Sequence, residues 1–186
     1  MRLAMNFAAP PEKSFDLSES CLDGATRFLR RLWSLVHDRK DVFSKEIGDV
    51  DVANESALEL RRQTHELIAK AEDDFGRRLQ FNTVVSSVME LVNSVSRFDL
   101  SNDHDHSVVR EALEAILIVI SPIAPHIAHE LWTSMTDREE IKRGDWPQLD
   151  STALQRSTMP LAVQVNGKLR ASINISSELD KEAIFS

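Results

Sequence analysis

The chain has 186 residues, 42% of them hydrophobic, which is enough for one sizeable core. Its 30 acidic and 22 basic residues give a formal net charge of −8, so bulk charge excludes a general nucleic-acid binder, and contact with nucleic acid would need a local basic patch. The single cysteine, Cys21, excludes a disulfide within the chain and suits the reducing cytoplasm, and no apolar run reaches the ~20 residues of a membrane span.

The N-terminal part of the sequence predicts an extended lead-in and then a helix. Pro10 and Pro11 disfavour a helix within residues 1–17. Ser18 or Ser20 can act as the N-cap of a first helix, because a serine hydroxyl accepts a hydrogen bond from the first turn. Apolar residues with the helical period predict its buried face: Ala25, Phe28, Leu29, Leu32, Leu35 and Val36.

Three arginines on the other face of this helix are candidate RNA contacts. Arg27, Arg30 and Arg31 have the spacing i, i+3 and i+4, so their guanidinium groups project to the same side. Such a cluster suits phosphate oxygens, which position RNA without reading its sequence. The alternative is a solvated face whose arginines pair with neighbouring acids, an arrangement that contributes little energy.

Two more helices follow a solvated connection at residues 41–54. The periodicity predicts a second helix at 55–74, ended by Gly76, and a third at 81–98, rich in valine. The segment SNDHDHS at 101–107 is predicted to be a solvated turn rather than a cation site.

The most apolar stretch of the sequence is residues 110–132. Its apolar residues lie three and four apart, which predicts a buried helix even though the run ILIVI favours a strand by propensity. Two prolines interrupt it, and Ser121 can cap a new segment that begins with Pro122. We expect one helix ending near Ile120 and a second from Pro122 to about Met135, with a kink between them. Four helices with short connections predict an antiparallel bundle.

The polar residues of the last helix do not match a metal or catalytic signature. His126, His129 and Glu130 have the spacing H-x-x-H-E, which is neither of the zinc-protease patterns H-E-x-x-H and H-x-x-E-H, so we expect a structural role. Trp33 and Trp132 lie on or beside apolar stripes and are predicted to pack in the core rather than to serve as platforms on which bases stack. The sequence predicts no catalytic residue, metal or cofactor in this chain.

After a polar connector at 136–158, the segment LAVQVNGKLRASINI alternates with period two around Asn-Gly and predicts a β-hairpin. A three-residue loop, with Gly167 left-handed in a bulge, would keep the apolar side chains on one face. Gln164, Lys168 and Arg170 would then share the polar face as candidate contacts to the RNA backbone. The alternative is that they are edge-strand charges that block aggregation.

Five segments of this chain occur in the same order, and with similar spacing, in one enzyme family. They are MNFAAPPE, GATRFLRRLW, FNTVVSSVMELVN, SPIAPHIAHELW and VQVNGKLR. With them the chain resembles bacterial leucyl-tRNA synthetases, which are class I enzymes, over nearly its whole length. The related valine and isoleucine enzymes share the bundle, whereas VQVNGKLR points to the leucine enzymes.

The resemblance implies a mainly α fold. After the lead-in at 1–17, it implies an anticodon-binding-type helical bundle at 18–135, a connector at 136–158, and the truncated start of a small α+β C-terminal domain at 159–186. The family's HIGH and KMSKS signatures for ATP are absent from this sequence. The chain would therefore be a non-catalytic part of a cytoplasmic ligase that joins leucine to tRNA, with ATP and magnesium bound elsewhere in the enzyme.

The resemblance also implies the partners, which are leucine-specific tRNA and the enzyme's own catalytic domain within a monomeric enzyme. The leucine enzymes are thought not to read the anticodon bases; their helical domain supports the tRNA stem, and their C-terminal domain approaches the tRNA elbow. A different class of function stays open, a protein-interaction or structural bundle without RNA. In that case Leu3, Met5 and Phe7 would be the apolar residues that contact another domain or a second copy.

Overall fold

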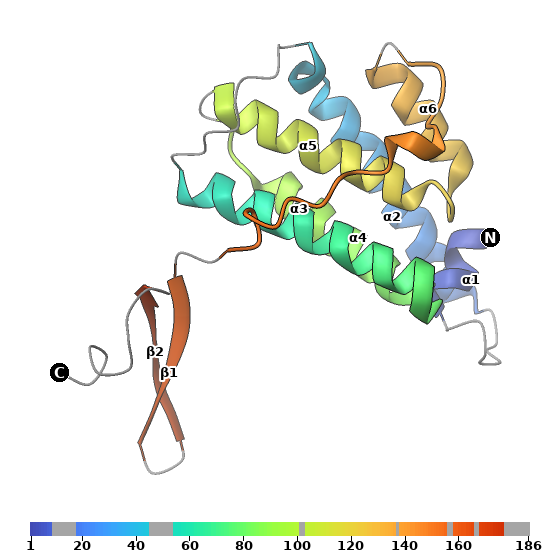
Figure 1. Ribbon diagram of the computed structural model, residues 1–186. Coiled ribbons are helices and arrows are strands. Elements are labelled where there is room, and N and C mark those ends of the chain that lie inside the picture. Colours follow the sequence, from blue (N-terminus) through green and yellow to red (C-terminus); the bar gives the residue numbers. More distant parts are fainter. Residues whose placement is uncertain are drawn as a thin grey trace. The chain divides into compact units, whose positions relative to one another are not determined.

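The structure is a computed structural model that describes residues 1–8, 18–44, 54–100, 103–136, 138–155, 158–165 and 168–176. Within these ranges it has six α-helices: α1 (Arg2–Ala8), α2 (Glu19–Asp38), α3 (Glu55–Asp73), α4 (Phe81–Arg97), α5 (Asp103–Ile120) and α6 (Pro125–Met135) (Figure 1). It also has the short turns η1 (Lys40–Phe43), η2 (Asp74–Arg78) and η3 (Arg143–Asp145) and the strands β1 (Thr158–Val165) and β2 (Lys168–Ser176). The chain forms two compact units, Met1–Ala153 and Leu154–Ser186. No helix in the described ranges has the length and apolarity to cross a membrane.

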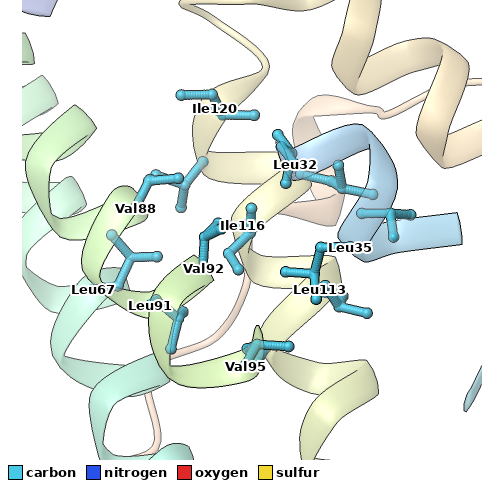
Figure 2. Packing of buried hydrophobic residues seen from close by; sticks show 14 of the residues in the cluster. Leu32, Leu35, Leu67, Val88, Leu91, Val92, Val95, Leu113, Ile116 and Ile120 are labelled. Atoms are coloured by element: carbon cyan, nitrogen blue, oxygen red, sulfur yellow. The ribbon is translucent and has the colours of Figure 1, made fainter. Parts of the chain in front are cut away.

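The core of the first unit is built around α5, which contacts α3, α4 and α6. All residues from Ala115 to Ile120 are buried, so the run ILIVI is a helix with core on every side. Figure 2 shows part of this cluster of buried hydrophobic residues, with labelled members Leu32, Leu35, Leu67, Val88, Leu91, Val92, Val95, Leu113, Ile116 and Ile120. The prediction of a mainly helical bundle is therefore confirmed for the described residues.

The start and the buried face of α2 also agree with the prediction. The Ser18 hydroxyl oxygen accepts a hydrogen bond from the Cys21 backbone N–H at 3.3 Å, and Glu19 lies at the positive end of the helix. Five of the six predicted stripe residues are buried and Leu29 is half-buried against the core.

The N-terminus differs from the prediction of an extended lead-in, because residues 2–8 form α1. Leu3 and Ala4 are buried in the core, and α1 contacts α2 and α4. A seven-residue helix is marginal in isolation, so these tertiary contacts stabilise it. Pro10 and Pro11, on which the prediction rested, lie outside the described residues.

The end of α3 is also different, because Gly76 does not close the helix. A π-helical turn, η2, follows α3, and Leu79 takes the left-handed conformation with φ 52°. The Asp74 carboxylate is fully buried there and accepts a hydrogen bond from the Thr83 hydroxyl of α4. This contact joins the π-helical turn to α4. It gives a physical reason why the chain continues as a π-helical turn after α3.

The predicted turn at 101–107 is wrong from Asp103 onward, because α5 already begins there. Asp105 is fully buried and Ser107 nearly so, hence this part of the segment is not solvated.

The break between α5 and α6 lies where the prolines predicted it, but α6 begins three residues later than expected. Its N-cap residue is Ala124, and Pro125 occupies the first turn, where the missing N–H costs nothing. Ser121 is not a cap of α6; its hydroxyl donates to the Ile118 carbonyl oxygen at 2.8 Å.

Residues 138–153, which we call the returning segment, pack along α3 (Figure 1). The Trp146 indole N–H donates to the Glu72 carboxylate at 3.3 Å, and its ring lies edge-on to Phe75 with the centroids 6.1 Å apart. The predicted connector therefore contributes side chains to the bundle.

A polar network fastens the same segment nearer the N-terminal end of α3. The Arg61 guanidinium donates to Asp150 at 2.8 Å and to Glu111 of α5 at 3.2 Å. His65, which is 2% exposed, accepts the Asp150 backbone N–H at Nδ1, 3.2 Å away. Its Nε2 must then carry the proton that bonds Glu111 at 3.1 Å. Three separate parts of the chain meet in this network.

In the second unit, β1 and β2 are antiparallel, with the opposite pairs Met159–Ile175, Leu161–Ile173, Val163–Ala171, Gln164–Leu169 and Val165–Lys168. The last pair leaves two residues between the strands, so the predicted three-residue loop is wrong. The extra residue is instead Arg170, at a register shift next to Val163. Gly167, which was predicted to be left-handed, lies outside the described residues.

Candidate nucleic-acid interface

The three predicted arginines lie together on the exposed face of α2. Arg27, Arg30 and Arg31 are all exposed, whereas the other face of the helix is buried against the bundle. The amphipathic pattern of α2 fixes this orientation, because turning the arginines inward would expose the apolar stripe.

No ion pair joins these arginines to a carboxylate among the described residues. The Arg31 guanidinium donates to the Asn93 side-chain oxygen of α4, which is a neutral partner. A guanidinium has five N–H donors, so one hydrogen bond leaves most of this capacity available for another acceptor. The face of α2 therefore carries positive charge that acidic side chains in the described ranges do not neutralise at contact distance.

The arginines of α3 are arranged differently. Arg62 lies between Glu59 and Glu66, and the hydrogen bond with Glu59 raises the pKa of Arg62. Just beyond the helix, Arg77 donates to Asp73 at 2.7 Å, and this hydrogen bond lowers the pKa of Asp73. The alternative that we considered for α2, a salt-bridged solvated face, describes α3.

A shallow hollow of about 350 Å³ lies between α2 and α4, beside Arg31. Arg39 also lines it and is held in place by a hydrogen bond of 2.7 Å from its guanidinium to the Phe98 carbonyl oxygen. Asp38 lines the same hollow and puts a carboxylate beside the two cations. The hollow is therefore of mixed charge, and the uniformly positive part of α2 is the segment with the three arginines.

The two tryptophans predicted to pack in the core have different environments. Trp132 is 1% exposed, which confirms the prediction for that residue. Trp33 is 40% exposed and stacks on His37, with ring centroids 4.6 Å apart and an angle of 25° between the planes. The prediction is wrong for Trp33, because it lies at the edge of the apolar stripe; the aromatic pair at i and i+4 was the signal for this stack.

The other predicted contacts lie in the second unit. Gln164 is in β1 opposite Leu169, Lys168 begins β2, and Arg170 is at the register shift. Their side chains lie outside the described part of the structure, so their role as RNA contacts stays a prediction.

The polar residues of α6 form no metal site among the described residues. His126, His129 and Glu130 are exposed on α6. No group of three His, Cys, Asp or Glu side chains among the described residues could hold a metal ion. Cys21 is a half-buried free thiol.

Nothing in the sequence indicated that Asn93 and Arg39 would lie beside the arginine face of α2. Each depends on α2 and α4 lying side by side, with partners 62 and 59 residues apart along the chain. Helical spacing carries no information about such pairs.

Comparisons with known proteins relate this chain to one group of enzymes. The family model described as the anticodon-binding domain of tRNA ligase matches residues 58–185. The leucine–tRNA ligase of Chromohalobacter salexigens is 48% identical over 184 residues, which cover 99% of this chain and 22% of that protein. The leucine–tRNA ligase of Alcanivorax borkumensis is 42% identical over 186 residues, which cover 100% of this chain and 23% of that protein.

A solved structure agrees with these sequences. It is the ternary complex of the Agrobacterium radiobacter K84 agnB2 LeuRS with tRNA and LeuAMS, with a TM-score of 0.82 and 26% sequence identity. The match covers 99% of this chain and 24% of that chain. The chain therefore spans less than a quarter of the length of these relatives.

Proposed function

This chain belongs to the anticodon-binding domain family of tRNA ligases, and on that premise we propose that it is the tRNA-docking part of a leucine–tRNA ligase. The whole enzyme would attach leucine to its tRNA using ATP and magnesium, in the cytoplasm and as a monomer. The reaction would take place in a catalytic domain outside this chain, which is therefore the second proposed partner besides leucine-specific tRNA.

The observation that carries the proposal is the exposed face of α2. Arg27, Arg30 and Arg31 present three guanidinium groups on one side, without an ion pair to a described carboxylate. In a protein with a formal charge of −8, such a face is the local basic patch that contact with RNA requires.

The mechanism is electrostatic docking together with fixed geometry. Guanidinium groups donate to phosphate oxygens on the tRNA backbone, which places the RNA without reading its sequence. Because α2 is packed along its whole apolar face, the three side chains start from a rigid support. Holding the tRNA in one orientation would bring its acceptor end to the distant active site and reduce the entropic part of the barrier there.

Each part of the chain would have its own role in docking the tRNA. The bundle, residues 18–135, would support the tRNA stem, and residues 136–158 would connect it to the next domain. Residues 159–186 would be the opening of a small α+β domain, with Gln164, Lys168 and Arg170 as its contacts to the RNA backbone.

The test is a titration of labelled leucine tRNA, followed by fluorescence anisotropy at several salt concentrations. The variant that replaces Arg27, Arg30 and Arg31 with alanine should bind about 10- to 100-fold more weakly, and its salt slope should fall by up to about three. Its thermal unfolding should match that of the original chain, since the three side chains are exposed.

The matched control replaces three cations of the α3 region, Arg62, Lys70 and Arg77, with alanine. This variant loses the same charge, so an equal loss of affinity in both variants would contradict a specific role for α2. An unchanged salt slope in the α2 variant would remove the three arginines from the interface.

A second candidate function, a protein-docking bundle, is favoured by one feature of α1. Met5 is 51% exposed and Phe7 38% exposed, so this helix leaves apolar surface uncovered. If this surface binds a second copy of the chain, light scattering will show a dimer at high concentration. A monomer would count against self-association.

A further inference from the structure

The exposed stack of Trp33 on His37 is an unusual use of a tryptophan in this bundle. Trp132 is buried and Trp146 contacts Phe75 and Glu72 at the returning segment, whereas Trp33 presents 40% of its surface to solvent. Trp33 is therefore not among the buried residues of the core, where the sequence predicted it.

The stack is fixed before any ligand arrives. His37 Nδ1 lies 2.9 Å from the Trp33 carbonyl oxygen, and because a carbonyl only accepts, Nδ1 must be the donor. This bond holds the imidazole one turn beyond the indole, with the two planes 25° apart. A planar ligand that adds to the stack would therefore not have to order these two side chains first.

The charge beside the stack identifies the kind of ligand. Arg30 precedes Trp33 by three residues, which places it one helical turn away on the same side of α2. Arg27 and Arg31 extend the positive charge along the helix, again without described carboxylate partners. A ligand that offers flat aromatic faces and regularly spaced negative charges is a nucleic acid strand. The bases of a paired stem are covered by their neighbours, so the nucleotide must be unpaired.

We propose that Trp33 and His37 form a stacking platform for one unpaired base of the tRNA, with Arg30 bound to a phosphate beside it. This inference rests on the proposed function, because it requires α2 to face the tRNA. It adds a contact that depends on base stacking to a surface otherwise defined by charge.

The experiment compares Trp33→Leu with Trp33→Phe in the full chain, titrated with labelled leucine tRNA. Leucine keeps an apolar side chain with good helix propensity but removes the aromatic face, whereas phenylalanine keeps a ring. Trp33→Leu should weaken binding about tenfold, Trp33→Phe should stay within about threefold of the original chain, and the salt slope should be unchanged in both. Leu58→Ala is the matched control, because Leu58 is an apolar side chain of α3 that is 47% exposed.

Tryptophan emission provides an independent measurement. Saturating tRNA should quench the emission of the original chain by stacking on Trp33, and this part of the quenching should be absent from Trp33→Phe, which retains Trp132 and Trp146. Equal quenching in both chains would overturn the platform. So would a loss of affinity in Trp33→Phe as large as that in Trp33→Leu.

The two proposals can fail separately. If the triple arginine variant loses affinity and Trp33→Leu does not, the docking function stands and the platform is wrong, which would leave Trp33 for contact with another protein surface. If neither variant loses affinity, both proposals are wrong.

Discussion

The arginines of α2 and those of α3 are the same residue type on neighbouring helices, but they have different surroundings. On α3, Arg62 has Glu59 and Glu66 within one turn, and Arg61 is bound by Glu111 and Asp150 from distant parts of the chain. On α2, Arg31 donates to the amide oxygen of Asn93 and has no ion pair with a carboxylate among the described residues. The acids around an arginine, and not its exposure alone, therefore decide whether its charge stabilises the fold or is available to a partner.

The largest expected effect is on stability and comes from replacing Arg61. An arginine of α3 that is bound by carboxylates should contribute to the free energy of unfolding, whereas an arginine of α2 should not. Arg61→Met should lower the free energy of unfolding by about 2–3 kcal/mol, because it leaves Glu111 and Asp150 close together without their shared cation. Urea denaturation measures this change. Arg27→Met, the control on α2, should stay within about 0.5 kcal/mol of the original chain. If the two variants lose equal stability, the contrast between the helices is wrong.

The pH dependence of stability should show the contribution of the Asp150 carboxylate to the same network. Hydrogen bonds from the Thr152 hydroxyl and N–H, together with Arg61, hold the pKa of Asp150 below its usual range. A folded-state pKa below the unfolded value of about 3.9 adds stability above that pH, and this stability is lost as the pH falls toward the folded-state pKa. Between pH 5 and pH 3 the urea midpoint should therefore fall less in Asp150→Asn than in the original chain. Parallel curves would mean that Asp150 does not contribute.

A smaller effect is expected from giving α2 the acid that α3 already has. Ser34→Glu places a carboxylate four residues after Arg30 and three after Arg31, as Glu66 is placed after Arg62. Affinity for leucine tRNA should fall about three- to tenfold at low salt, because the new charge competes with phosphate.

Two controls accompany this variant. Ser34→Gln has a similar size without the charge and should bind almost as the original chain does. Glu66→Gln frees part of Arg62 on α3 and should not raise the affinity. A gain of affinity from Glu66→Gln would place α3 in the interface as well.

The sequence was sufficient for the features that depend on local period and capping. The stripes of α2, α3 and α4, the Ser18 cap and the exposed side of the three arginines all follow from spacing within one helix. The resemblance to leucyl-tRNA synthetases, based on five short segments, is confirmed by the family model and by the leucine–tRNA ligases that match.

The features that were missed depend on contacts between distant residues. α1 forms because Leu3 and Ala4 reach the core, and Leu79 rather than Gly76 turns left-handed where the buried Asp74 contacts Thr83. For the candidate site, helical spacing placed the arginines on one face. It could not show which acids the fold would bring to them, because that depends on how the helices pack.

The returning segment has a consequence for the protein during its synthesis. Arg61 leaves the ribosome 89 residues before Asp150, and Glu72 leaves 74 residues before Trp146. Since chains are made from the N-terminus, the side of α3 that this segment covers must wait for these late partners even after every helix of the bundle has been made. Of the carboxylates of Glu111 and Asp150, Arg61 can bind only that of Glu111 until Asp150 has been made. The bundle is therefore completed by the last residues before the second unit begins.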